Sequence, residues 1–271
     1  MRRIVWSIVL LVVATPSLPA LATGTTDGLV YTQKGTLPII LTAPHGGKEK
    51  VPGVELRTGG GAKNFKVVLD TRTHELATAI AADLEAMLGG SVYVVAAEFS
   101  RKYIDANRSF EEGAETPAAK PYYDRYHNAI RADVDEVRAR FKRGLLVDVH
   151  GQGQTDHLDQ VMRGTRNGAT CKQLIATFGD KAVVGPTGLF GLLEHNGLKV
   201  FPANQSPLIR EDALNGGYTV ATYGSSTDSG IDAFQMEFGT NLRAAASIKS
   251  TANATAKSIA AFYRAYIAPR K

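Results

Sequence analysis

The chain has 271 residues, of which 44% are hydrophobic and 21% charged, and its formal net charge is +5 at pH 7. This is the composition of an ordinary globular protein with a sizeable core. No run of basic residues interleaved with aromatics occurs, so we expect no nucleic-acid partner. The lone cysteine, Cys171, cannot form an internal disulfide, so the fold must be held by its core or by a metal.

Residues 1–22 have the pattern of a secretory signal peptide. A short positive start is followed by an apolar stretch, 4–14, that is too short to span a bilayer comfortably, and residues 20–22 give a small-x-small cleavage site. The alternative is a retained single-pass anchor. No later segment approaches transmembrane length. We therefore expect cleavage after Ala22 and an exported protein, periplasmic or secreted, with no stable membrane association.

Short apolar runs alternate with amphipathic helical patterns along the rest of the chain. Strands are predicted at 37–43, 91–99, 144–149 and 231–238, and helices at 73–88, 122–141 and 243–267. Strands separated by helices of this length indicate an α/β fold, with a mostly parallel or mixed sheet that helices flank on both faces. We expect a lead-in at 23–36 and one domain at 37–271. The loop-rich segment 152–230 is predicted to build the walls of a site.

Polar side chains stand where three of these strands end. His45 follows the first strand within Pro-His-Gly-Gly, His150 follows the strand at 144–149, and Glu237 lies at the end of the last strand. Ligands of such sheets bind beyond the carboxyl ends of the strands. Two imidazoles and a carboxylate there are the components of a catalytic zinc site, so we predict that His45 and His150 bind Zn²⁺. Asp148 shares a side of its strand with His150 and could orient that ring.

The third zinc ligand is open on the residues alone. Asp70 stands near the start of the helix at 73–88, where its carboxylate would project toward the strand ends, although an aspartate there is commonly an N-cap. Glu49 and His74 are the other candidates. Gly46 and Gly47 follow His45 and would leave room for a ligand.

Arg101 and Arg108 are the expected substrate contacts, since guanidinium groups bind carboxylates bidentately. The alternative is that Asp105 and Asn107, which lie between them, hold the two arginines in a structural network.

Arg163, Thr165 and Asn167 lie on a predicted loop near the site and are further candidate substrate contacts. Their alternative role is that of solvated loop residues.

Several motifs in this order resemble the N-formylglutamate amidohydrolase family, from about residue 38 to 265. They are TAPHGG, LDTRTHELA, SRKYIDANRS, YYDRYHNAI and LLVDVHGQG. The family is similar to zinc carboxypeptidases and zinc N-acetylmuramoyl-L-alanine amidases, which implies a hydrolase fold like theirs, of the phosphorylase/hydrolase-like kind. The resemblance implies that His45, Asp70 and His150 hold the metal and that Glu237, in FQMEFGTNLR, is the catalytic glutamate. The alternative role of Glu237 is that of a buried carboxylate paired with Arg243.

A metal-dependent hydrolase of amide C–N bonds follows from this resemblance, with a small carboxylate-bearing N-acyl amino acid or short peptide as substrate. Zn²⁺ would lower the pKa of its bound water to about 7 and polarise the scissile carbonyl. Glu237 would take the water proton and pass it to the leaving amine. The signal peptide argues against formylglutamate itself, because histidine catabolism is cytosolic. The alternatives are a cell-wall peptide or muramoyl amidase, and an exported binding protein without turnover.

Overall fold

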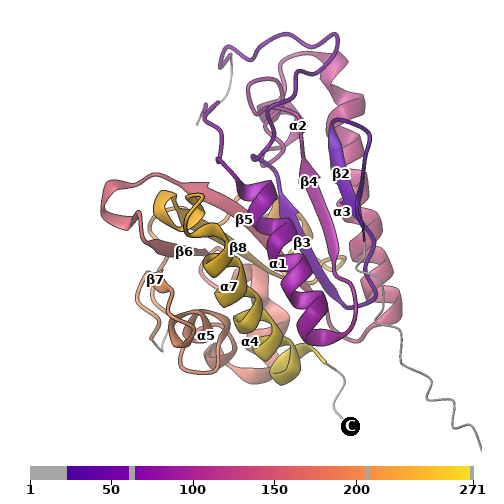
Figure 1. Cartoon of the computed structure of the whole chain (residues 1–271). Coiled ribbons are helices and arrows are strands. Elements are labelled where there is room, and N and C mark those ends of the chain that lie inside the picture. Colours follow the sequence, from indigo (N-terminus) through magenta and orange to yellow (C-terminus); the bar gives the residue numbers. More distant parts are fainter. Residues whose placement is uncertain (1–22, 61–64, 206–207, 269–271) are drawn as a thin grey trace, which may run out of the picture.

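The computed structural model describes residues 23–60, 65–205 and 208–268 (Figure 1). The predicted signal peptide lies outside these ranges. Within them, no helix combines the length and the hydrophobicity that a membrane-spanning segment needs.

The described ranges contain eight strands and seven α-helices. The strands are β1 (Thr25–Thr26), β2 (Val30–Gln33), β3 (Ile39–Ala43), β4 (Tyr93–Ala97), β5 (Leu145–Gln152), β6 (Gln160–Gly164), β7 (Lys199–Phe201) and β8 (Asp232–Gly239). The helices are α1 (Thr73–Leu88), α2 (Phe110–Gly113), α3 (Lys120–Arg140), α4 (Lys172–Phe178), α5 (Leu189–His195), α6 (Tyr218–Tyr223) and α7 (Ile248–Phe262). Single 3₁₀ turns lie between them, and a π-helical turn, Tyr263–Ile267, follows α7.

All the described strands join one sheet in the order β1-β2-β4-β3-β5-β8-β6-β7. Its centre, β4-β3-β5-β8, is parallel. The strands β2 and β6 run antiparallel to their central neighbours, so the sheet is mixed and mostly parallel. The carboxyl ends of β3, β5 and β8 therefore meet at one edge of the sheet, which is where a parallel sheet places its ligands.

Helices cover both faces of the sheet. Along β3 the side chains alternate: Leu41 packs in one core with Leu76 of α1, and Ile40 packs in the other core with Ile130 of α3. Figure 1 shows α1 and α7 together on one face, with α3 behind the sheet. Both faces of β3 are buried, which explains its continuous apolar sequence.

The predicted α/β fold with a mostly parallel sheet is confirmed. The helix predicted at 73–88 has those bounds, and Gly89 closes it in the left-handed conformation at φ 70°, donating its N–H to Glu85. The segment 152–230 is rich in loops, as expected, because most of its described residues lie outside helices and strands, although it also contains the strands β6 and β7 and the helices α4, α5 and α6.

Candidate metal centre and active-site pocket

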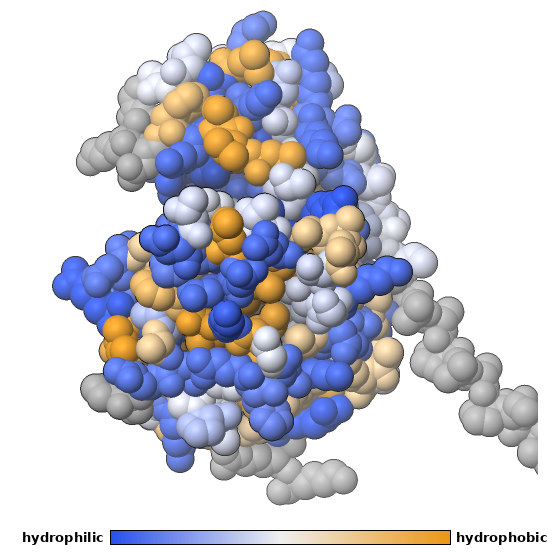
Figure 2. Space-filling model, turned by 60° about the vertical axis from the view of Figure 1, so that its left-hand side comes forward, coloured by the Kyte–Doolittle hydropathy of each residue, from blue (hydrophilic) through white to orange (hydrophobic). Residues whose placement is uncertain are grey.

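A pocket of about 650 Å³ lies beyond the carboxyl ends of β3, β5 and β8. Figure 2 shows this side of the molecule hollowed between an upper and a lower part, with hydrophobic surface gathered above the hollow. The pocket is lined by residues that are far apart in the sequence: His45 and the segment before Asp70, then Asn107, His150, the turn at 214–217 and Glu237. The predicted metal ligands and the predicted base thus share one cavity.

Neighbouring parallel strands place these side chains together. Thr42 of β3 pairs with Asp148 of β5, and His150 of β5 pairs with Glu237 of β8. The strand β5 runs on to Gln152, so His150 lies within the strand rather than after it. His45 follows the end of β3 and lies with its ring centroid 4.9 Å from that of His150.

The glycines after His45 have another role than the one expected. A Cβ on Gly46 would lie 2.7 Å from the Thr73 hydroxyl of α1, and a Cβ on Gly47 would lie 2.2 Å from the carbonyl oxygen of Glu98. The glycines therefore let the His45 turn pack closely against α1 and the end of β4, and this close packing positions the imidazole.

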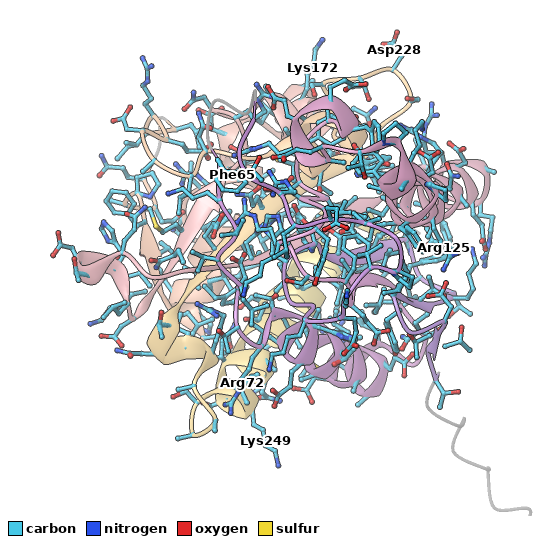
Figure 3. The ribbon with its side chains drawn as sticks, turned by 90° about the horizontal axis from the view of Figure 1, so that it is seen from above. Phe65, Arg72, Arg125, Lys172, Asp228 and Lys249 are labelled. Atoms are coloured by element: carbon cyan, nitrogen blue, oxygen red, sulfur yellow. The ribbon has the colours of Figure 1, made fainter. Side chains whose placement is uncertain are left out.

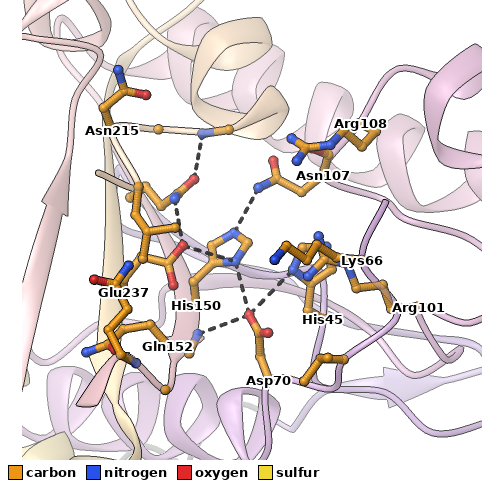
Figure 4. A pocket seen from close by; sticks show the side chains of 18 residues that line it. His45, Lys66, Asp70, Arg101, Asn107, Arg108, His150, Gln152, Asn215 and Glu237 are labelled. Carbon is orange, nitrogen blue, oxygen red and sulfur yellow. Dashed lines mark hydrogen bonds and ion pairs between the residues drawn. The ribbon is translucent and has the colours of Figure 1, made fainter. Parts of the chain in front are cut away.

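The Asp70 carboxylate completes a group that could hold a metal ion. Its Oδ2 lies 3.2 Å from Nδ1 of His150 and 3.4 Å from Nδ1 of His45, and it accepts a hydrogen bond of 3.0 Å from the N–H of Gly151 (Figure 4). The ligand atoms of these three buried residues all lie within 4.8 Å of one another. Asp70 is not the N-cap of α1, because Arg72 occupies that position.

A carboxylate orients each imidazole from behind. Asp105 Oδ1 lies 2.7 Å from Nε2 of His45, and Asp148 Oδ2 lies 2.9 Å from Nε2 of His150. With the Nε2 atoms so engaged, both rings turn Nδ1 toward Asp70. Metal-binding histidines are usually held in this way. Asp148 was proposed from the sequence in this role, whereas Asp105 was considered only as a partner of the arginines.

Two observations fit a divalent cation among these donors. Nδ1 of His45 is buried and has no hydrogen-bond partner among the described residues, which is costly for a polar atom unless something else binds it. The cavity floor is also rich in buried carboxylates, since Asp70, Asp148 and Glu237 all lie near His150. Burial lowers the pKa of His150, but these carboxylates raise it well above its ordinary value. A cation bound there would balance the same negative charge.

The other two candidate ligands lie elsewhere. Glu49 is exposed and forms an isolated bridge with Phe99. His74 lies against the ring of Tyr31 and 4.0 Å from Glu98. Neither is among the described residues that line the pocket.

His45, Asp70 and His150 together form the metal-candidate group. Glu237 lies at the edge of this group, with its Oε1 4.0 Å from Nδ1 of His150. Gln235 donates a hydrogen bond of 2.9 Å to the same oxygen and accepts one of 2.7 Å from the N–H of Gly217. Burial raises the pKa of Glu237. Arg243, the alternative partner, donates instead to backbone carbonyl oxygens, those of Thr71, Phe238 and Gln152. The role of Gln235 was not predicted from the sequence.

Cations line another side of the pocket. Arg101, Arg108 and Lys66 line the cavity. Other cations, such as Lys172 and Lys249, project outward from opposite sides of the molecule (Figure 3). Figure 4 shows these three on one side of His150, with Glu237 and Asn215 on the other.

The two arginines are engaged differently. Arg101 donates from Nε to Asp105 at 2.8 Å and lies 2.8 Å from the same carboxylate through its terminal nitrogen, so the alternative of a structural network applies to it. Among the described residues, the guanidinium of Arg108 forms only a long hydrogen bond of 3.4 Å, to the carbonyl oxygen of Asn107. Its guanidinium is therefore the more available of the two for a substrate carboxylate.

Arg163, Thr165 and Asn167 do not line the pocket, which corrects the expectation that they contact substrate. Arg163 lies in β6, not in a loop, and it pairs with Met236, whose side chain stands on the opposite face of the sheet from that of Glu237. It forms a fully buried ion pair of 2.8 Å with Glu211. The side chain of Thr165 and the backbone N–H groups of Thr165 and Asn167 also donate to this carboxylate.

Sequence comparisons relate the chain to known proteins. The family model described as N-formylglutamate amidohydrolase matches residues 116–243. An N-formylglutamate deformylase of Pseudomonas putida is 28% identical, over 55% of this chain and 67% of the relative.

Two solved structures share the fold. The N-formylglutamate amidohydrolase of Ralstonia eutropha JMP134 superposes with a TM-score of 0.59 at 18% identity, covering 88% of this chain and 99% of that one. A gene product of Agrobacterium tumefaciens superposes with a TM-score of 0.54 at 14% identity, covering 85% and 91%. With the α/β architecture and a His-Asp-His group that could hold a metal, the chain is similar to the N-formylglutamate amidohydrolase family, whose model matches it over residues 116–243.

Proposed function

We propose that this chain is an exported, zinc-dependent amidohydrolase that cleaves the amide bond of a small N-acyl amino acid or short peptide bearing a carboxylate. The observation that carries the proposal is the buried group in which Nδ1 of His45 and Nδ1 of His150 both face Oδ2 of Asp70. The relative from Pseudomonas putida, named for deformylation of N-formylglutamate, supports a small acylated amino acid as substrate.

His45, Asp70 and His150 would hold the zinc, a set of two nitrogens and one oxygen that suits this ion. When bound, zinc would supply Lewis acidity, acidifying a water molecule and polarising the amide carbonyl.

Glu237 would act as the general base. It is close enough to the metal-candidate group to accept a proton from an attacking water and to pass it to the nitrogen of the leaving amine. Gln235 holds the carboxylate by a bond to one oxygen, which leaves the other oxygen free for this exchange. Arg108 would bind the substrate carboxylate, with Lys66 adding positive charge at the same side of the pocket.

Metal content tests the proposal. Protein beginning at Thr23 is prepared as wild type and as His45→Ala, His150→Ala and His195→Ala variants, and zinc is measured by elemental analysis. We expect about one zinc per chain, lost in the first two variants and kept in the third, because His195 is exposed and outside the pocket. Wild type that takes up no zinc when it is offered would refute the proposal.

Activity is then assayed on N-acyl glutamates and aspartates, on short peptides with an acidic residue, and on a muramoyl peptide, with Glu237→Gln as the inactive control. Turnover of the muramoyl peptide alone would favour the wall amidase over the proposed enzyme.

Export rests on the sequence pattern of residues 1–22. N-terminal sequencing of the protein recovered from the periplasm or medium of the expressing cells tests it. A chain that begins at Thr23 is the expected result, and full-length chain retained with the cells would contradict it.

A further inference from the structure

The mouth of the pocket carries hydrophobic side chains that the proposed chemistry does not explain. Among the residues that the structure describes, three large hydrophobic side chains are exposed: Leu56, Val68 and Leu214. Val68 is 69% exposed and Leu214 is 38% exposed, and both line the pocket that holds the metal-candidate group. Exposed apolar side chains that gather at a cavity mark a place where a ligand's apolar surface is covered.

Val68 lies on a segment without regular secondary structure that precedes Asp70. Every second residue of this segment, Lys66, Val68 and Asp70, lines the cavity, and the first two are exposed whereas Asp70 is buried. Val68 therefore offers a hydrophobic contact at a position between Lys66, whose positive charge suits a carboxylate, and Asp70, which faces the two histidines.

Leu214 lies on the far wall, next to Asn215. Figure 4 shows Asn215 across His150 from Arg101 and Lys66. The backbone at Leu214 has φ 51°, in the left-handed region that a branched apolar residue rarely adopts. A leucine that is both exposed and held in this conformation is costly for stability, which points to a role in binding.

Resting on the proposed function, we propose that the substrate carries an apolar acyl group of several carbons in place of a formyl group. Its carboxylate would bind Arg108 and Lys66, its amide would lie at the metal-candidate group, and its acyl chain would extend between Leu214 on one wall and Val68 on the other. A formyl group is a single carbon with no chain, so it would leave both hydrophobic side chains uncovered in a cavity of about 650 Å³.

Binding to an inert variant tests this inference apart from turnover. Zinc-loaded Glu237→Gln protein is titrated by calorimetry with N-formyl-, N-acetyl- and N-hexanoyl-L-glutamate. We expect the affinity to rise by at least about 10-fold from the formyl to the hexanoyl compound, because each methylene group that leaves water contributes to binding.

Two variants in the same background localise the effect, and a third is the control. Val68→Ser and Leu214→Asn should remove most of the increase with acyl length, asparagine being a polar residue that tolerates the left-handed backbone. Leu56→Ser should leave the increase unchanged, because Leu56 is 54% exposed but outside the described lining of the pocket.

Equal affinity for the three compounds, or an increase that survives both pocket variants, would overturn the inference. Hydrolysis of the formyl compound by wild type in that case would leave the proposed function standing. Conversely, tighter binding of the hexanoyl compound without hydrolysis of any amide by zinc-loaded wild type would support the apolar subsite and refute the proposed amidohydrolase.

Discussion

Asp105 lies 2.7 Å from Nε2 of His45, although the two residues are 60 positions apart in the chain. Arg101 binds the other oxygen of the same carboxylate, and the burial that raises the pKa of Asp105 is outweighed by His45 and Arg101, which hold it well below its ordinary value. The charged carboxylate fixes the His45 ring with Nδ1 toward Asp70.

Replacement of Asp105 by asparagine should therefore weaken metal binding while the ligands themselves remain. Such partners of metal-bound histidines typically contribute about 10- to 100-fold in metal affinity, and we expect a loss of this size for zinc. Competition with a chromogenic chelator measures it. Asp228→Asn, an exposed substitution, is the matched control. Unchanged zinc affinity in Asp105→Asn would show that His45 needs no such partner.

Gln235 connects a pocket wall to the proposed base. Its amide accepts from the N–H of Gly217 and donates to Glu237, so the wall at 214–217 sets the direction in which the amide points. A Gln235→Leu variant keeps the volume but loses the donor. A hydrogen bond to a charged group contributes about 1.5–3 kcal/mol, so kcat should fall by about 10- to 100-fold.

The measurement is kcat and KM together with zinc content. Zinc stoichiometry and KM should change little, which separates the positioning of Glu237 from damage to the metal group or to the carboxylate site. A Gln235→Glu variant, which places a second carboxylate against Glu237, should lose more activity than Gln235→Leu. Equal kcat in wild type and Gln235→Leu would contradict the proposed role.

The ends of the buried strands β3 and β5 were predictable because each strand begins with a continuous apolar run. In β3 and β5 the apolar run stops at or near a histidine, and parallel connections bring those ends together, so His45 and His150 could be paired without a structure. Asp70 could be proposed for the same reason, as a residue at the start of the helix that follows β3.

Side-chain contacts between residues that are far apart in the sequence were not predictable. Nothing near Asp105 indicates His45, and the close Arg101 offers a sufficient local explanation for the carboxylate. Arg163 was predicted to lie in a loop because β6 was not recognised as a strand. The face of the sheet on which Arg163 lies follows only from the register of β6 with β8. Its partner Glu211 is 48 residues away, in a segment without regular structure.

The buried pair of Arg163 and Glu211 gives a prediction about stability. Glu211→Gln would leave the fully buried guanidinium without its charged partner, and breaking a buried pair from one side typically costs about 3–5 kcal/mol. Urea unfolding of the metal-free protein measures this loss in the free energy of unfolding.

The neighbouring residue supplies a control for that experiment. Asp212 pairs with Arg210 at the surface, where both side chains are about 80% exposed, so Asp212→Asn should cost about 0–1 kcal/mol. A Glu211→Gln variant as stable as Asp212→Asn would show that the buried pair contributes no more than the exposed one.

His127 of α3 gives a prediction about pH. Its Nε2 lies 3.0 Å from the carbonyl oxygen of Ala106 and its Nδ1 lies 2.9 Å from the hydroxyl of Tyr223. Burial lowers the pKa of His127 to about 4, below the ordinary value of 6.5. The unfolded chain therefore binds a proton between pH 6.5 and 4 that the folded chain does not. Its contribution to stability is complete above pH 6.5 and falls as the pH drops toward 4, by about 3 kcal/mol at most.

Asp133, also in α3, acts in the opposite direction. Burial raises its pKa to about 6, so the folded chain holds a proton there that the unfolded chain has lost, and stability falls as the pH rises from about 4 to 6. The two trends partly cancel in wild type. Urea unfolding of metal-free His127→Gln between pH 4.5 and 7 should remove the acid-dependent loss and leave the Asp133 trend, so that this variant is relatively more stable at pH 4.5. Asp133→Asn should do the reverse. If the free energies of unfolding of His127→Gln and wild type change in parallel with pH, His127 is not the source of the predicted pH dependence.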